Sequence, residues 1–261
     1  MKSTPAVDRR SPLIYAASLL RFHSVEAAMV LVEDMKPLKM GNKTAFVGGY
    51  SILTTLQKAE PKEGYKVLFG PSERSAIWMT SLKAEQSIRD LLLAFQEGRF
   101  GFTSVTSEGM FAMVGLSDML GLYEAGAIGS DLTVREVASK VVEVDKHTRV
   151  REALRLMLER RIRRVFIHGT KAFLSDRELV SNIFSPRKLK EAKQTPSAIL
   201  EGTVLEAGPV EPIEVDGGLP LKEAAKLVVR TQGGAILCEE GVVSPWDVVM
   251  KPFATGHLNV R

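Results

Sequence analysis

Short polar corners with a carboxylate at their fourth position recur along the chain and have residue types that could bind a ligand. They are Ser244-Pro245-Trp246-Asp247, Ser175-Asp176-Arg177-Glu178 and Gly115-Leu116-Ser117-Asp118. One interpretation is a capping box, in which an N-cap serine and an N3 carboxylate satisfy the free amides at the start of a helix. The other is a ligand site, because a helix N-terminus attracts anions and a carboxylate can accept hydrogen bonds from both hydroxyls of a ribose. Both interpretations can hold at the same corner.

The corners recur because the chain is built from repeated units. The expected first helices of these units begin about 65 residues apart, at Val25, Ile88, Val150 and Leu221. The last two units share short sequences in the same order: Thr133-Val134 with Thr203-Val204, Glu143-Val144-Asp145 with Glu214-Val215-Asp216, and Arg151-Glu152-Ala153 with Lys222-Glu223-Ala224. Four units fill the chain.

Each unit has the periodicity of a strand, a helix, a two-stranded hairpin and a second helix. In the third unit we predict a strand over 140–144, a helix over 150–161, a hairpin over 164–174 and a helix over 175–184; the fourth unit repeats this order over 203–251. In the second unit we predict a strand over 77–82, a helix from Ser87, a hairpin over 101–114 and a helix near Leu116. The first unit is degenerate, and we predict a helix over 24–34, a hairpin turning at 41–43 and a helix from Ser51. We expect a charged linker over 186–196.

Pairing of the units follows from their size. A unit of about 60 residues is marginally stable alone, and its small sheet needs a cover on the free face. Pairing the first unit with the second, and the third with the fourth, would supply that cover. We therefore predict an α+β fold with two modules, residues 1–125 and residues 126–261.

The composition is that of a globular protein. The chain has 35 Lys and Arg, 31 Asp and Glu, 45% hydrophobic and 25% charged residues, which excludes disordered and collagen-like classes. The single cysteine, Cys238, cannot form a disulfide framework, and no apolar run has the length of a membrane helix, so we expect a cytoplasmic protein that does not enter a membrane. The apolar stretch 12–20 after Arg9-Arg10 is typical of an export signal, but it runs into a segment with capped-helix composition, and we interpret it as part of the fold.

Motifs of catalysis and metal binding are missing from the sequence. It contains no phosphate loop, no nucleophile elbow and no His-Glu-x-x-His sequence. The histidines lack metal-ligand spacing: His23, His147, His168 and His257. Trp78 and Trp246 stand in apolar contexts that favour packing over stacking on a base. We predict a protein that is not an enzyme and uses no cofactor or metal.

The units resemble the cystathionine-β-synthase (CBS) domain family, whose strand-helix-hairpin-helix repeats work in pairs called Bateman modules. The resemblance is carried by Ser244-x-x-Asp247 and the hairpin turn 239–241 in the fourth unit, and by Thr-Val-Arg-Glu-Val from Thr133 and Arg163-Arg164 in the third. The first two units match loosely. Four CBS repeats in one chain are similar to the gamma subunits of AMP-activated protein kinase, and this resemblance implies adenine-nucleotide binding between paired repeats.

In this family each site is crossed, because the threonine before the first strand of one repeat meets the corner of its partner. The resemblance implies one site of Thr133, Ala138, Ser244 and Asp247, and a second of Thr203, Ser175 and Glu178. Asp118 would serve a third site against the first unit, although Gly115 replaces the hydroxyl there. Thr54 stands where the first corner, Ser51-Ile52-Leu53-Thr54, would need its carboxylate, so we expect the fourth site to be empty.

The resemblance also assigns a phosphate-binding role to basic residues. Arg163 and Arg164 occupy the place where family members carry a basic pair, just before the first strand of the hairpin. The planar fork of arginine suits phosphate oxygens. The neighbouring helix mixes arginines with Glu152 and Glu159, so an ordinary solvated, self-paired face is the alternative interpretation of this charge.

The hypothesis that follows is a non-catalytic regulatory protein that binds AMP, ADP or ATP between paired repeats and signals to a protein partner. S-adenosylmethionine is a less favoured ligand, and a homodimer is an open alternative. A nucleic-acid-binding protein is a second hypothesis, suggested by the pI near 9.1 and the basic runs 160–164 and 187–190, although a net charge of +4 is a weak footprint. A ligand-free scaffold with the same fold is a third.

Overall fold

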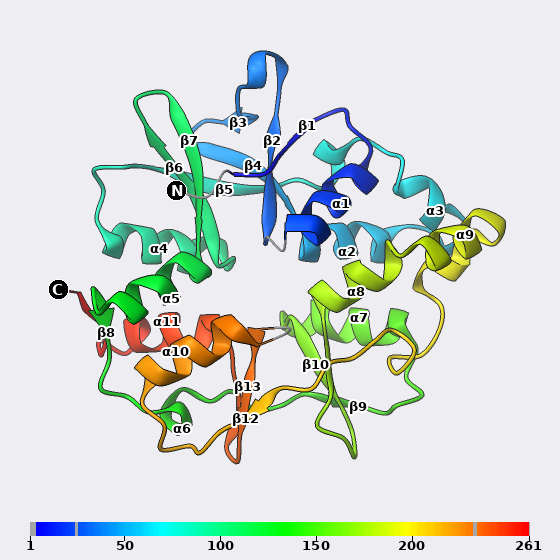
Figure 1. Cartoon of the computed structure of the whole chain (residues 1–261). Helices are drawn as coiled ribbons and strands as arrows, with labels where there is room; N and C mark the ends of the chain where they lie inside the picture. Colours follow the sequence, from blue (N-terminus) through cyan, green and yellow to red (C-terminus); the bar gives the residue numbers. More distant parts are fainter. Residues whose placement is uncertain (1–3, 24–25, 232–233, 261) are drawn as a thin grey trace. The chain divides into compact units, whose positions relative to one another are not determined.

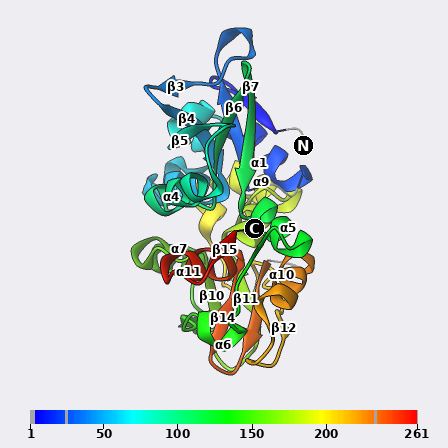
Figure 2. The ribbon, with the colours of Figure 1, turned by 90° about the vertical axis from the view of Figure 1, so that its left-hand side faces the viewer.

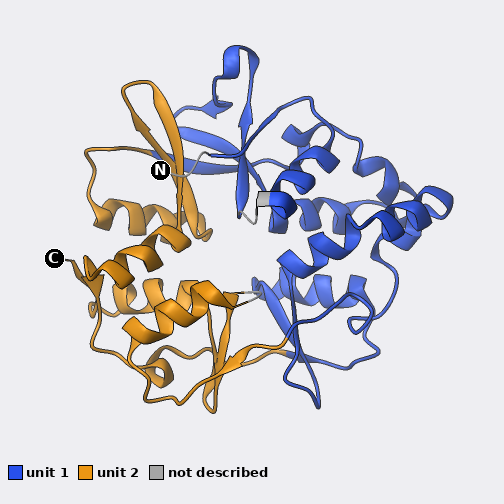
Figure 3. Cartoon of the chain, in the orientation of Figure 1, with its two compact units in different colours: residues 1–81, 143–210 blue, residues 82–142, 211–261 orange. Residues whose placement is uncertain are grey.

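A computed structural model describes residues 4–23, 26–231 and 234–260. The chain divides into two compact units, unit 1 with residues 1–81 and 143–210 and unit 2 with residues 82–142 and 211–261 (Figure 3). Of the four sequence repeats, the first and third lie mainly in unit 1, and the second and fourth lie mainly in unit 2. The α+β fold is confirmed, whereas the modules 1–125 and 126–261, which join neighbouring repeats, stay a prediction.

The first repeat, in unit 1, has the expected order of elements but lies closer to the N-terminus than predicted. It consists of β1 (Ala6–Asp8), α1 (Leu13–His23), β2 (Ala27–Leu31), β3 (Lys39–Met40), β4 (Lys43–Gly48) and α2 (Gly49–Lys58) (Figure 1). Strand β1 pairs parallel with β2, and β4 pairs antiparallel with β2 and with β3. The predicted turn after β3 is confirmed.

The predicted helix over residues 24–34 is wrong. Residues 24 and 25 lie outside the described residues, so the anchor Val25 is not described, and β2 follows with all five side chains buried. The first helix is α1, in the stretch that resembles an export signal. Its buried face has the i, i+3, i+4, i+7 spacing of an amphipathic helix: Leu13, Ala16, Ala17 and Leu20. A strand buried on both faces does not alternate, and so periodicity cannot distinguish it from a buried helix.

The third repeat completes unit 1 and confirms the prediction to within a few residues. It consists of β9 (Glu143–Val144), α7 (Val150–Arg160), β10 (Arg164–Ile167), β11 (Phe173–Ser175) and α8 (Asp176–Ile183). Strand β10 pairs parallel with β9 and antiparallel with β11. The buried face of α7 repeats the spacing seen in α1: Val150, Ala153, Leu154 and Met157.

The predicted linker over 186–196 is wrong as well, because most of it is helical. It forms α9 (Pro186–Gln194), which is followed by the 3-10 helix η4 (Pro196–Leu200). The Ser185 hydroxyl accepts a hydrogen bond from the Lys188 amide at 3.3 Å, and Pro186 occupies the first helical position, where its missing N–H is harmless. Both α9 and η4 pack against α3 (Gly64–Val67), so this charged segment is part of unit 1.

Unit 2 contains the second and fourth repeats, both as predicted. The second consists of β5 (Ile77–Lys83), of which residues 77–81 belong to unit 1, α4 (Ile88–Gly98), β6 (Phe102–Ser107), β7 (Met110–Gly115) and α5 (Leu116–Ala125). The fourth consists of β12 (Ile213–Glu214), α10 (Leu221–Arg230), β13 (Ile236–Cys238), β14 (Gly241–Val243) and α11 (Pro245–Ala254). Each unit has its own apolar core. None of the helices in the described ranges has both the length and the apolar character that crossing a membrane requires.

A short helix, α6 (Val134–Val137), lies against the hairpin of the fourth repeat in unit 2. It packs on β14 and α11 and lies beside this hairpin in both views (Figures 1 and 2). The segment that leaves α6 is joined to β14 by two main-chain hydrogen bonds of 2.9 Å between Ser139 and Val242. Gly241 has a φ of +147°, and a Cβ there would clash with the Ser139 carbonyl oxygen. Only glycine therefore allows this close approach.

We expect Gly241→Ala to destabilise unit 2 by about 1–3 kcal/mol, because the new methyl group must push away the backbone at Ser139. Urea unfolding monitored by circular dichroism measures this. Gly121→Ala is the control, because Gly121 lies in α5 and a Cβ added there would meet nothing within 4 Å. That change should be neutral or stabilising by up to about 1 kcal/mol. Equal effects of both substitutions would contradict the close approach.

Candidate functional site

The corner of the fourth repeat is a buried capping box. Ser244 follows β14 with an extended backbone and is the N-cap of α11, Pro245 takes the first helical position, and Asp247 is N3. The Ser244 amide donates to Asp247 Oδ2 at 2.9 Å, and the Ser244 hydroxyl donates to the same oxygen at 2.6 Å. Ser244 is 7% and Asp247 5% exposed. Buried carboxylates need such partners, because an unpaired charge is costly to remove from water.

The other oxygen of Asp247 is engaged by groups that sequence analysis did not identify. The Ser139 hydroxyl donates to Asp247 Oδ1 at 2.7 Å, and the Lys251 ammonium lies 3.2 Å from that oxygen. Lys251 also donates to the carbonyl oxygens of Val137 at 2.6 Å and Ala138 at 3.0 Å, and to the Ser139 hydroxyl oxygen at 2.8 Å. The segment after Thr133 and the corner of Ser244 and Asp247 are therefore in direct contact within unit 2.

The corner of the third repeat, in unit 1, has the same construction with a longer acid. Ser175 is the N-cap of α8 and Glu178 is N3. The Ser175 hydroxyl and amide both donate to Glu178 Oε2, and the Ser175 hydroxyl oxygen accepts from the Arg177 amide at 3.2 Å. Ser175 is 2% and Glu178 8% exposed.

The segment that begins at Thr203 lies beside this third-repeat corner. Phe173, in β11, and Val210 exchange main-chain hydrogen bonds of 2.8 and 2.9 Å. On α8, the Asn182 side-chain amide lies 3.5 Å from the carbonyl oxygen of Glu206. This contact corresponds to that of Lys251 with the segment after Thr133, so the two units repeat one crossed arrangement.

The two threonines themselves hydrogen bond within their own turns. The amide and hydroxyl of Thr133 both donate to Glu136 Oε2 at 2.7 Å, and those of Thr203 donate to Glu206 Oε2 at 2.7 and 3.2 Å. These hydrogen bonds, led by the one from the threonine amide, lower the pKa of Glu136 and of Glu206. The segments of Thr133 and Thr203 thus reach the corners, but the threonine hydroxyls are directed to glutamates.

The predicted basic pair, Arg163 just before β10 and Arg164 as the first residue of β10, has partners inside unit 1. The Nε of Arg163 donates a hydrogen bond of 2.9 Å to Oδ2 of the buried residue Asp176. The distance from Arg163 Nη2 to the same oxygen is 2.7 Å. The Arg164 guanidinium carbon lies 5.9 Å from the centre of the Phe173 ring, within range of a cation–π interaction. A phosphate group bound here would have to share Arg163 with Asp176.

The remaining two corners are less complete. Asp118 is exposed, and its Oδ2 accepts a hydrogen bond from the Gly115 amide at 2.8 Å. The predicted corner of the first repeat, Ser51 to Thr54, is placed three residues too late, because Gly48 is the N-cap of α2 and Ser51 is N3. The Thr54 hydroxyl donates to the Tyr50 carbonyl oxygen at 2.8 Å inside the helix. The correct corner also lacks a carboxylate, so the expectation of an empty site is unchanged.

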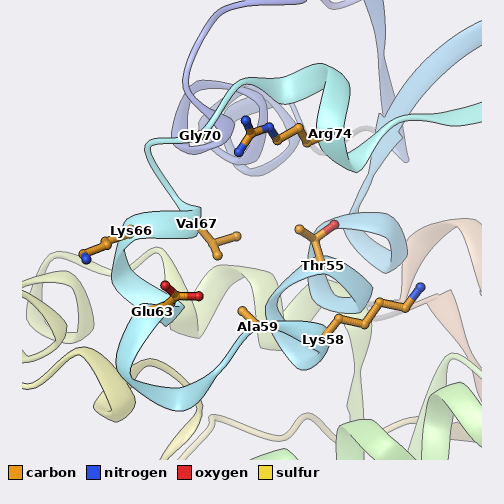
Figure 4. Close-up of a pocket in the computed structure, with 8 residues that line it drawn as sticks. All are labelled: Thr55, Lys58, Ala59, Glu63, Lys66, Val67, Gly70 and Arg74. Carbon is orange, nitrogen blue, oxygen red and sulfur yellow. The ribbon is translucent and has the colours of Figure 1, made fainter.

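A surface pocket of about 410 Å³ in unit 1 does not form an anion site. It is lined by Thr55, Lys58, Ala59, Glu63, Lys66, Val67, Gly70 and Arg74 (Figure 4). Lys58 and Lys66 extend away from one another, and the Glu63 carboxylate lies among the lining residues (Figure 4). A phosphate needs convergent donors without a competing carboxylate, and these side chains do not converge. Within the described ranges, no group of three or more metal-ligating side chains comes together either.

Sequence signals existed for several residues that were missed. Glu136 and Glu206 each follow a threonine by three residues, which is the spacing of the capping box. Lys251 follows Asp247 by four residues on one helix, a spacing that allows a salt bridge. Nothing in the sequence indicates that the ammonium also reaches the carbonyl oxygens of Val137 and Ala138, because this contact joins residues 114 and 113 positions apart.

The fold and the paired corners have the arrangement that the resemblance to CBS repeats implies. Residues 134–185 match the CBS domain, and this span includes α6 of unit 2 and the third repeat from β9 to α8. The resemblance noted in the sequence is thereby confirmed for the span 134–185, which matches one CBS domain. No curated protein matches the sequence significantly.

Solved structures support this architecture over almost the whole chain. A protein of Methanocaldococcus jannaschii, proposed to be an archaeal homolog of g-AMPK, is 14% identical; the match covers 97% of this chain and 96% of that one, with a TM-score of 0.80. An uncharacterized conserved protein from Pyrococcus horikoshii is 9% identical, with 95% of each chain covered and a TM-score of 0.51. CBSX2 in complex with AMP is 19% identical over 47% of this chain and 97% of its own, with a TM-score of 0.36.

We expect Asp247→Asn to destabilise unit 2 by about 1–3 kcal/mol, because the amide places a donor against the Lys251 ammonium and the Ser139 hydroxyl. Asp118→Asn is the matched control at an exposed corner and should cost at most about 0.5 kcal/mol. Urea unfolding of both variants measures the difference. An Asp247→Asn variant as stable as Asp118→Asn would show that the buried contacts are not formed.

The turns at Thr133 and Thr203 predict a pH dependence. Because hydrogen bonds lower the pKa of Glu136 and Glu206 in the folded protein, these groups contribute stability above the ordinary carboxyl pKa. This contribution is lost as the pH falls through the lowered values. Side-chain carboxyl NMR titration should place both pKa values below that of an ordinary glutamate, and a value at or above the ordinary one would contradict these turns.

Proposed function

We propose that this chain is a regulatory protein that binds an adenine nucleotide, AMP, ADP or ATP, at the crossed corners of its CBS repeats. Binding would be read by a protein partner and would involve no catalysis. CBS domains generally have regulatory roles, and the proposed g-AMPK homology of the Methanocaldococcus jannaschii protein makes adenine nucleotides the first ligands to test. S-adenosylmethionine is the next.

The observation that supports this proposal best is the pair of buried N3 carboxylates, Glu178 and Asp247, each beside a segment from the following or preceding repeat. A nucleoside monophosphate has a flat base, a diol and a dianion. A carboxylate suits the diol, and a helix N-terminus has a partial positive charge suited to the phosphate. The main chain of the neighbouring segment offers hydrogen-bonding groups to the base.

The other predicted residues enter the proposal with defined roles. Ala138 and Thr133 would line the site of Ser244 and Asp247, and Thr203 that of Ser175 and Glu178. Asp118 would belong to a third site, and Arg163 and Arg164 would contact phosphate. Since Arg163 is hydrogen bonded to Asp176, its contribution would require an exchange of partners.

Signalling requires that the nucleotide bind one packing of the repeats more tightly than another, because a ligand shifts an equilibrium only through its differential affinity. We propose that the partner is a protein, which is not identified. A homodimer of this chain is the alternative. A location in the cytoplasm belongs to this proposal as well. The nucleic-acid hypothesis gains no specific support, because the basic residues Arg163 and Arg187 pair with carboxylates.

Nucleotide binding predicts thermal stabilisation of the full chain. On protein shown by mass spectrometry to be free of ligand, AMP, ADP or ATP at about 100 times its dissociation constant should stabilise the fold by about 2.7 kcal/mol. Differential scanning calorimetry measures the shift, and inosine monophosphate at the same concentration, which differs from AMP only in its base, is a control for the base. A melting temperature unchanged by all three nucleotides and by S-adenosylmethionine would contradict the proposal.

A further inference from the structure

The Lys251 ammonium in unit 2 is enclosed by oxygen atoms. Four oxygens lie within 3.2 Å of it: the carbonyl oxygens of Val137 and Ala138, the Ser139 hydroxyl and Asp247 Oδ1. An ammonium has three N–H donors, so every donor has an acceptor. The cation is therefore held in place, even though its side chain is 35% exposed.

This arrangement saturates Asp247. A carboxylate has about four lone-pair positions. Oδ2 accepts from the amide and hydroxyl of Ser244, and Oδ1 accepts from Ser139 and contacts Lys251. A ribose diol needs two of these positions, so it could bind only by displacing Lys251 or Ser139. Two main-chain carbonyls beside the corner are occupied by the same ammonium.

The corner in unit 1 lacks both competing groups. Asn182 stands four residues after Glu178, where Lys251 follows Asp247. Val210 pairs with β11 as Ser139 pairs with β14, so an apolar side chain replaces the hydroxyl. Glu178 is only 8% exposed, and within the described ranges only its Oε2 accepts hydrogen bonds, both from Ser175. Glu178 Oε1 is thus available to a ligand.

We propose that Lys251 is a tethered cation that keeps the fourth-repeat corner closed to nucleosides, so that the ribose is bound by Glu178 at the third-repeat corner. This inference rests on the proposed function and decides which corner performs it. It reverses the order suggested by sequence, in which Ser244-x-x-Asp247 is the better match and Glu178 the poorer. Residue 251, and its counterpart Asn182, determine which corner accepts a nucleotide.

The test exchanges the two residues in the full chain and counts AMP binding by isothermal titration calorimetry. Lys251→Asn should add one AMP per chain relative to the unchanged protein, and Asp247→Asn in the same chain should remove that addition. Asn182→Lys should place an ammonium against Glu178 and lower the affinity for AMP about tenfold or more, as should Glu178→Gln. Lys226→Asn is the control, a lysine on α10 with 32% exposure paired with Glu223.

The outcomes separate this inference from the proposed function. If Asp247→Asn weakens AMP binding about tenfold, the proposed role of Lys251 is wrong, while nucleotide binding stands. The same conclusion follows if Lys251→Asn folds but does not increase AMP binding. Absence of binding of AMP, ADP and ATP to the unchanged protein and to every variant overturns both. If Lys251→Asn does not fold, by circular dichroism, then Asn182→Lys and Glu178→Gln decide the question with the same expected results.

Discussion

A carboxylate buried at the third position of a helix is the interaction on which both halves of this protein depend. Burial removes the charge from water, so each oxygen must find a hydrogen-bond donor within the protein or on a ligand. The N-cap serine supplies two donors to one oxygen at both Glu178 and Asp247. What reaches the second oxygen differs between the two units, and in our proposal this difference separates a structural corner from a nucleotide-binding corner.

The repeat architecture places these carboxylates by simple means. In α1, α7 and α10 the same spacing of buried apolar residues presents one helical face to a core, and a short hairpin then delivers the chain to an N-cap. The segment from the partner repeat is fixed by paired main-chain hydrogen bonds, Ser139 with Val242 and Phe173 with Val210. Gly241 permits the first of these approaches by having no side chain. Apolar spacing, helix capping and paired main-chain hydrogen bonds therefore bring segments that are distant in the sequence to the same corner in each unit.

Sequence reasoning recovered what local patterns determine. The elements of the last three repeats, the serine-carboxylate corners and the crossing of Thr133 and Thr203 segments toward them follow from periodicity, capping and the family resemblance. The prediction was wrong at β2 and α1, because a strand that is buried on both faces shows no alternation of apolar and polar residues. It was also wrong at α9, where the charged composition was interpreted as a linker although Ser185 and Pro186 are typical of a helix start. Lys251 was missed because its carbonyl partners lie 114 and 113 positions away, so that only the folded chain reveals how Asp247 is saturated.

The most direct test of this account is a crystal structure of the protein with AMP bound. The account predicts that the ribose hydroxyls lie within hydrogen-bond distance of Glu178 Oε1, beside Ser175 and the segment 203–210. It predicts that Lys251 keeps its contacts with Val137, Ala138 and Asp247. A structure with the ribose on Asp247 and Lys251 turned into solvent, while the Glu178 corner holds no nucleotide, would contradict it.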